Sequence, residues 1–144
     1  GQGLLVAKDN TDITSPDDLA GKVVCSVTGS TPLQRIRDEY KPGDTREYDT
    51  YSQCIDQLLQ GQVDAITTDE AILAGYVAQQ PDKLKIAGEP FSTENYGVGL
   101  PKGDTVLKEH INKLFTDGGD VWTALFDEHL APSGIKATQP AVEN

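Results

Sequence analysis

Gly29, Ser30 and Thr31 form a small polar corner between an apolar segment that ends at Val27 and a helix-like pattern that begins at Pro32. Such a corner brings backbone N–H groups, two hydroxyls and the positive end of a helix dipole to one point. That combination attracts an anion. The anion is a phosphate, a carboxylate of a ligand or only water, and these residues alone do not decide among them.

A second polar corner follows the apolar segment Val63–Thr67, where Thr68 and Asp69 precede another helical pattern. In open parallel sheets ligands bind outside the carboxyl ends of the strands, so both corners are expected at one edge of a sheet. Hydroxyl and N–H donors would then hold a carboxylate, and Asp69 would hold an ammonium group. The pair predicts a site for a zwitterion, such as an α-amino acid. Asp69 fits equally well as the N-cap of its helix, and its two oxygens make both roles compatible.

Catalytic chemistry has little support in the sequence. A nucleophilic Ser30 would need a base, and His110 and His129 stand far along the chain at positions typical of exposed helical residues. Two dispersed histidines also make no metal site, and a phosphate loop is absent because no Gly-Lys pair follows the Gly-Ser-Thr corner. We therefore expect a binding function, with no catalytic residue, no metal and no cofactor.

The charge balance limits the partners. With 12 Lys and Arg against 23 Asp and Glu, the formal net charge is -11, and this field repels nucleic acid and anionic membrane surfaces. No apolar run approaches the roughly 18 residues of a membrane span. The chain contains no Met and opens on a strand-like segment, Gly3–Ala7, so we expect it to be a processed or cut product.

The two cysteines lack the spacing of a zinc or redox motif, since Cys25 lies in a predicted strand and Cys54 in a predicted helix. Two states remain open. In an exported protein a disulfide that closes this loop would add about 3 kcal/mol to the stability. Otherwise both are reduced core residues.

Strands and helices alternate with short connections over the first part of the chain. Ser15 is expected to start a short helix that ends at Gly21, and Thr31 to be the N-cap of the next helix in a capping box with Gln34. Apolar periodicity predicts strands over residues 3–7, 22–27, 46–49, 63–67 and 84–87, and helices over 52–60 and 69–79. This order predicts an α/β fold with a mostly parallel sheet flanked by helices.

The pattern changes after Phe91. Residues 95–100 are predicted to be extended, and residues 105–116 and 120–130 to be helical with clear apolar stripes. Two helices with one strand cannot close a layer by themselves. Residues 132–144 contain Pro140 and few apolar side chains, so we expect a loose tail.

The order of these motifs resembles family 3 of the bacterial extracellular solute-binding proteins, which have the type 2 periplasmic binding protein fold. Within that family it is most similar to the glutamate-binding lipoproteins of actinobacteria. The resemblance extends over residues 3–135, and it is specific through the order and spacing of the motifs. They are LVAK (5–8), SPDDLAGKVV (15–24), GST (29–31), GQVDA (61–65) with Asp69, and YGVGLPKG (96–103).

In this family two α/β lobes close over the ligand, and the second lobe is inserted between the halves of the first. The resemblance implies that residues 1–92 are the second lobe with the first crossover strand. Residues 93–131 are then the return to the first lobe, with its C-terminal strand and helices, and residues 132–144 are the tail. It further implies that the N-terminal part of the first lobe is missing, and that the hinges are Gly3–Ala7 and Glu89–Asn95.

The resemblance also assigns ligand-binding residues by position. Gly29, Ser30 and Thr31 are implied to bind a carboxylate, and Asp69 the α-ammonium group, with Thr68 beside it as a further contact. The same Gly-Ser-Thr triplet occurs in the ligand domains of ionotropic glutamate receptors, where the Thr contacts the distal carboxylate. This favours glutamate over neutral amino acids.

The family's clamp for the α-carboxylate is an arginine in the missing part of the first lobe. Nothing in this chain replaces it, because Arg35 and Arg37 are expected on a solvated helix face. The extracellular setting of the family also favours a disulfide between Cys25 and Cys54.

The function implied is the extracytoplasmic binding component of an ABC importer, with glutamate, or else glutamine or aspartate, as ligand. Its partners would be the amino acid and the permease subunits, with no nucleic acid. It would lie at the extracellular face of the cell membrane or in a periplasm, attached only through a lipid anchor that this chain lacks. Two alternatives stay open: an amino-acid sensing module without a transport role, and a cyclohexadienyl dehydratase-like lyase, which would need a general acid or base beyond Asp69.

Overall fold

The computed structural model describes residues 1–142, and its internal contacts divide the chain into two compact units, Gly1–Glu94 and Asn95–Asn144. Each unit is described by itself. The division falls two residues beyond the predicted boundary between residues 92 and 93. The assignment of the units to two lobes stays a prediction.

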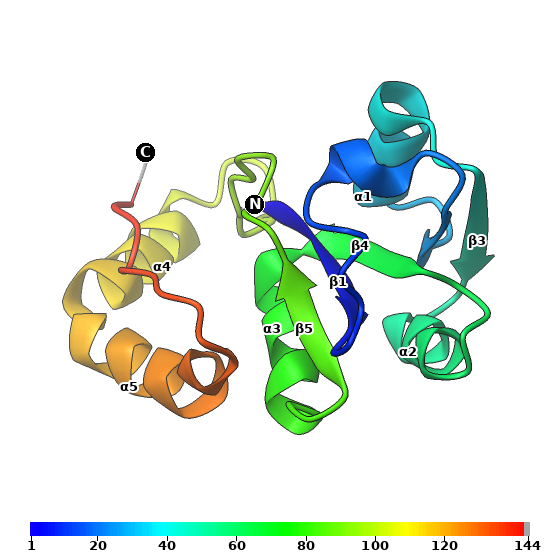
Figure 1. Ribbon diagram of the computed structural model, residues 1–144. Helices are drawn as coiled ribbons and strands as arrows, with labels where there is room; N and C mark the ends of the chain where they lie inside the picture. Colours follow the sequence, from blue (N-terminus) through cyan, green and yellow to red (C-terminus); the bar gives the residue numbers. More distant parts are fainter. Residues whose placement is uncertain (143–144) are drawn as a thin grey trace. The chain divides into compact units, whose positions relative to one another are not determined.

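The first unit is built on one five-stranded sheet with the order β3-β2-β4-β1-β5 (Figure 1). The central strands β2 and β4 run parallel to each other, and β3 is parallel to β2, whereas β1 runs antiparallel to both β4 and β5. Four strands therefore share one direction and β1 opposes them, which confirms the mostly parallel α/β sheet. The strands are β1 (Gln2–Ala7), β2 (Val23–Val27), β3 (Asp44–Tyr48), β4 (Ala65–Asp69) and β5 (Leu84–Ala87).

Helices cover both faces of this sheet (Figure 1). One face packs under α2 (Tyr51–Leu59) and α3 (Glu70–Gln79), and the other under η1 (Pro16–Leu19), α1 (Thr31–Arg35) and the π-helical turn η2 (Ile36–Tyr40). Successive residues of a strand point to opposite faces, so β1 serves both cores. Leu5 packs with the α2 and α3 side, and Leu4 and Val6 with the α1 side.

The short helix η1 begins as predicted. Ser15 is its N-cap, Pro16 takes the first helical position, and Asp18 closes a capping box. The Asp18 carboxylate accepts hydrogen bonds from the Thr14 N–H (2.9 Å), the Thr14 hydroxyl (2.8 Å) and the Ser15 N–H (3.0 Å). These bonds, led by the one from the Thr14 N–H, favour the ionised form and lower the pKa of Asp18 from its ordinary value of 3.8.

We predict that Asp18→Asn flattens the acid limb of the stability profile. Because the folded pKa lies below the unfolded one, ionised Asp18 adds stability above the unfolded pKa, and this stability is lost as the pH falls through the folded pKa. Urea midpoints of parent and variant should therefore differ at neutral pH and converge in acid. Asp17→Asn removes the same charge in the same turn without these bonds, and its curve should keep the parent's shape. Parallel curves for parent and Asp18→Asn would contradict the prediction.

The N-cap of α1 differs from the prediction. Ser30, not Thr31, is the N-cap: its hydroxyl accepts the Leu33 N–H at 3.4 Å, and Thr31 is the first helical residue. The Gln34 amide donates to Asp38 instead of closing a capping box. The positive φ of Gly29, +71°, turns the chain one residue earlier than expected and brings Ser30 to the capping position.

The other predicted elements of the first unit are confirmed within a few residues, with strands β3 and β4 and helix α3 displaced slightly at their ends. In the second unit the expected extended segment, residues 95–100, forms no strand. A strand needs a neighbour for its backbone hydrogen bonds, and the described part of this unit supplies no second strand.

The second unit consists of α4 (Thr105–Asp117), α5 (Gly119–His129) and the short η3 (Ala131–Ser133). Both predicted helices are confirmed, and His110 and His129 are exposed on them, as expected. Neither helix contains a buried residue, so their apolar stripes stay largely exposed. No helix among the described residues combines the length and apolarity that crossing a membrane requires.

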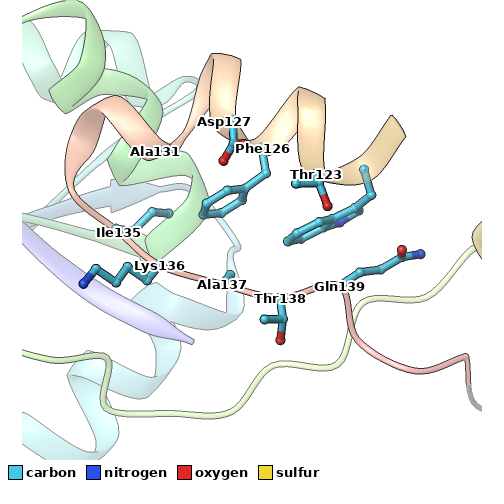
Figure 2. Close-up of a pocket in the computed structure, with 10 residues that line it drawn as sticks. Thr123, Phe126, Asp127, Ala131, Ile135, Lys136, Ala137, Thr138 and Gln139 are labelled. Carbon is cyan, nitrogen blue, oxygen red and sulfur yellow. The ribbon is translucent and has the colours of Figure 1, made fainter. Parts of the chain in front are cut away.

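The described part of the tail contains no helix or strand after Ser133, and it has contacts with the helices of this unit. Figure 2 shows Ile135 and Phe126 facing a hollow of about 370 Å³ between α5 and the chain that follows it. Gln139 donates a hydrogen bond to the Phe115 carbonyl of α4. Residues 143 and 144 lie outside the described residues.

Candidate functional site

The Gly-Ser-Thr corner lies at the carboxyl end of β2, where the sequence places it. Gly29 takes a left-handed backbone conformation, which side chains disfavour. The Ser30 N–H donates to the Val27 carbonyl (3.1 Å), so it is engaged within the turn. Thr31 is exposed, and its N–H at the first helical position has no acceptor within the helix. Thr31 therefore supplies the donors best placed for an anion.

The Ser30 hydroxyl is already engaged in this structure. Ser26 has one hydroxyl proton, and it donates that proton to the Thr67 carbonyl at 2.8 Å. In the 3.2 Å contact between the two serine hydroxyls, Ser30 is therefore the donor and Ser26 the acceptor. Since Ser30 also accepts the Leu33 N–H, its role here is to hold the corner rather than to present a free donor.

Asp69 ends β4 and stands at the N-cap position of α3, but its side chain makes no capping hydrogen bond to that helix. The carboxylate is half-buried. Alternation along β4 puts Asp69 on the same face as Thr67, which is the face that α1 covers. The acid is thus on the face of the sheet that carries the Gly-Ser-Thr corner.

Thr68 lies on the opposite face. It is 1% exposed and pairs across the sheet with Gly3, beside Leu73 of α3. Its side chain therefore does not share the face of Asp69, and the direct ligand contact expected from the sequence stays untested.

Gln2 joins the two corners, and the sequence did not single it out. It is the cross-strand partner of Asp69, and its side chain is 1% exposed. Its amide donates to the Pro32 carbonyl in the first turn of α1 and to the Thr67 hydroxyl of β4, both at 2.9 Å. The Thr67 hydroxyl in turn donates to the Gly3 carbonyl (3.0 Å). One sequence signal could have identified Gln2 as a buried residue. The two-residue periodicity of a strand places it on the same face as buried Leu4 and Val6.

Arg35 is not on a solvated face, contrary to the prediction. Its guanidinium donates to the Glu94 carboxylate at 2.9 Å, with Glu39 a second acid at 3.8 Å. Both partners of the Arg35–Glu94 pair keep about 30% of their side chain exposed. The Ser92 hydroxyl, donating at 2.7 Å, is the main cause of a lowered pKa of Glu94, and the charge of Arg35 adds to it. Arg37 is exposed, as expected, and it pairs with Glu47 and the Thr45 hydroxyl.

The two cysteines form a disulfide, which decides between the two states that the sequence left open. Cys25 of β2 and Cys54 of α2 are fully buried, with 5.7 Å between their Cα atoms. The bridge fastens β2 one residue before Ser26, and so supports the end of the strand that carries the corner.

The candidate site is an open edge of the sheet. Two hollows among the described residues lie elsewhere, one in the second unit and one of about 320 Å³ near Asp9, Asp12 and Asp64. Within the same described residues no cluster of His, Cys, Asp or Glu side chains could hold a metal ion.

Known proteins are similar to this chain in both sequence and fold. The glutamate-binding protein GluB of Corynebacterium efficiens is 43% identical over 127 residues, which cover 81% of this chain and 43% of GluB. An ancestral arginine-binding protein bound to glutamine superimposes with a TM-score of 0.73 at 35% identity, over 90% of this chain. This chain is similar in sequence to glutamate- and glutamine-binding proteins, and in fold to type 2 periplasmic binding proteins. No protein-family model matches the sequence.

A second solved structure of similar fold is a complex with glutamate. The GluR0 ligand-binding core of Nostoc punctiforme, in complex with L-glutamate, matches 90% of this chain with a TM-score of 0.76 at 28% identity. The chain spans less than half of GluB and about 60% of each of the two solved structures. The solute-binding proteins it resembles are thus substantially longer than this chain.

Proposed function

We propose that this chain forms one wall of the amino-acid site in the binding component of an ABC importer, with glutamate as the favoured ligand. The observation that carries the proposal is that Gln2 pairs with Asp69 across the sheet and bonds to the carbonyl of Pro32, the neighbour of Thr31. Donors for a carboxylate and an acid for an ammonium group are the two halves of a zwitterion site.

In the proposed complex Gly29 and Thr31 hold a ligand carboxylate through N–H and hydroxyl donors. Ser30 keeps the turn in shape, and Asp69 binds the α-ammonium group. Thr68 supports β4 from the opposite face, and its contact with the ligand beside Asp69 stays a proposal from its position in the sequence. Support for glutamate comes from GluB and from the glutamate complex of the GluR0 core, and glutamine is the next candidate because the ancestral arginine-binding protein holds it.

The mechanism we propose is closure of two lobes around the ligand. A ligand that contacts both lobes stabilises the closed state by its differential contacts, and the permease recognises that state. We propose that the first unit is the second lobe, that the second unit belongs to the first lobe, and that the permease subunits are the partners. The proposed location is the extracellular face of the cell membrane, through a lipid anchor, or a periplasm.

We predict that the 144-residue chain alone binds glutamate poorly or not at all, because a single wall leaves half of the ligand in water and supplies no clamp for the second carboxylate. A two-lobe protein that contains this chain together with the rest of the first lobe should bind it. Calorimetry of both proteins with glutamate, glutamine and aspartate tests this. Micromolar binding by the chain alone would contradict the proposal that this chain forms only one wall of the site. A two-lobe protein that binds none of the three amino acids would refute the proposed function.

A further inference from the structure

Gln2 has more partners in distant parts of the chain than its place at the start of a strand suggests. Its main-chain N–H donates to the Ser92 hydroxyl (2.8 Å), and its carbonyl accepts the Phe91 N–H (2.9 Å). Both of these residues belong to the segment that leaves the sheet after β5. Together with the amide bonds to Pro32 and Thr67, these contacts attach one residue to the return segment, α1 and β4.

A second path joins the return segment to α1. The Ser92 hydroxyl accepts from Gln2 and donates to Glu94 at 2.7 Å, and Glu94 accepts from Arg35 at 2.9 Å. Arg35 is the last residue of α1, and Pro32 of the same helix accepts a hydrogen bond from the Gln2 amide. The path therefore starts at Gln2, returns to the helix that Gln2 contacts, and closes a ring. We name this set, Gln2, Pro32, Arg35, Ser92 and Glu94, the crossover ring.

Gln2 contacts both segments that carry the proposed ligand groups. Pro32 directly follows Thr31, and Thr67 lies two residues before Asp69 on the same face of β4. Any displacement of the Gln2 side chain therefore changes the spacing between the two corners. Because the amide is buried and both of its acceptors are within 2.9 Å, the spacing has little freedom while these bonds persist.

We propose that Gln2 is a positioning residue for the amino-acid site: its amide sets the distance between Thr31 and Asp69, and the crossover ring couples this distance to the return segment. The inference rests on the proposed function for its ligand, but the coupling itself is a property of the chain without ligand. A shift of Ser92 and Glu94 relative to β1, such as lobe movement would produce, would reach the site through Gln2 and Arg35.

The first test measures the coupling in the 144-residue chain. Gln2→Met keeps an unbranched side chain of similar length but removes both amide donors, and Val6→Ala, on the same strand face, is the control for general destabilisation. Native-state hydrogen exchange should show the Leu33 and Gln34 amides opening about tenfold or more faster in Gln2→Met, relative to the global unfolding of the same variant. In Val6→Ala these amides should follow global unfolding alone. Equal behaviour of the two variants would overturn the proposal.

A second variant tests the same coupling without changing a core residue. Glu94→Gln removes the charge that Arg35 meets at a part-exposed position, so the core is untouched. Exchange of the Phe91 amide should accelerate, and that of the Leu33 amide should accelerate by a smaller factor, because a neutral amide oxygen accepts more weakly from Ser92 and Arg35 than the carboxylate does. Acceleration at Phe91 with no change at Leu33 would show that the return segment is not coupled to α1.

The third test separates this inference from the proposed function. In a two-lobe protein that contains this chain, Gln2→Met should weaken glutamate binding at least tenfold, with Val6→Ala near the parent. Parent-like affinity in Gln2→Met would overturn the positioning role and leave the proposed function standing. If the parent binds no glutamate, glutamine or aspartate, the proposed function fails, and the exchange measurements still decide the coupling.

Discussion

Replacement of Asp69 by Asn should lower the affinity for glutamate by about 30-fold or more in a two-lobe protein that contains this chain. The ammonium group of the ligand would remain in the closed site without its anion, and removing one partner of such a pair costs about 2–5 kcal/mol. The fold should tolerate the change, because Asn has nearly the size and shape of Asp and the position is half-buried. Isothermal calorimetry with glutamate measures the loss directly.

Glu70→Gln is the matched control for this variant. It removes one negative charge from the neighbouring residue, at the first position of α3, and it keeps the shape of the side chain. A general effect of net charge on an anionic ligand would strengthen binding in both variants alike, whereas a direct ammonium contact weakens binding only in Asp69→Asn. An unchanged dissociation constant for Asp69→Asn would remove this residue from the site.

The local parts of this fold were predictable because the residues that determine them are close in sequence. Ser15, Pro16 and Asp18 fix η1 within a single turn, and the apolar run of β2 is bounded by Gly21 and the Gly-Ser-Thr corner. Even here the cap of α1 was misassigned by one residue. Ser30 and Thr31 are chemically equivalent as caps, and only the left-handed turn at Gly29 distinguishes them.

The contacts between residues far apart in the sequence were not predictable from the sequence pattern. The position of β1 between β4 and β5, antiparallel to both, leaves no trace in its own sequence, which is simply an apolar run. The same holds for Arg35 and Glu94, which are 59 residues apart and look like ordinary surface charges on their own segments. Each pairing follows from the path of the chain as a whole.

The candidate site, too, was predictable only in its local features. The residue types of the two corners indicated the class of ligand, because donors and an acid at one sheet edge suit a zwitterion whatever their exact spacing. What supports those groups was hidden, since Gln2, Ser26 and Thr67 are polar residues inside strands and carry no motif. Buried polar residues must find partners. Here Gln2 and Ser26 both bond to Thr67, which lies beside the second corner. Ser26 also contacts Ser30 of the first corner.

Loss of the Cys25–Cys54 disulfide should remove about 3–4 kcal/mol of stability, a large share of the 5–15 kcal/mol typical of a domain. The bridge joins residues 29 positions apart, so in the unfolded chain it restricts a loop that spans α1 and β3. Urea denaturation of the parent and of the double variant Cys25→Ala/Cys54→Ala measures the difference. The variant should unfold at a clearly lower urea concentration.

Reduction of the parent provides the control, because it opens the bridge but leaves both sulfur atoms in the core. Both cysteines are fully buried among Leu5, Ile55 and Ile66, so the double Ala variant also loses packing that the reduced parent retains. The reduced parent should therefore fall between the oxidised parent and the double variant, and a reductant should not change the variant. Equal midpoints for the oxidised and reduced parent would show that the cross-link adds no stability. The fixation of β2 beside Ser26 would then rest on packing alone.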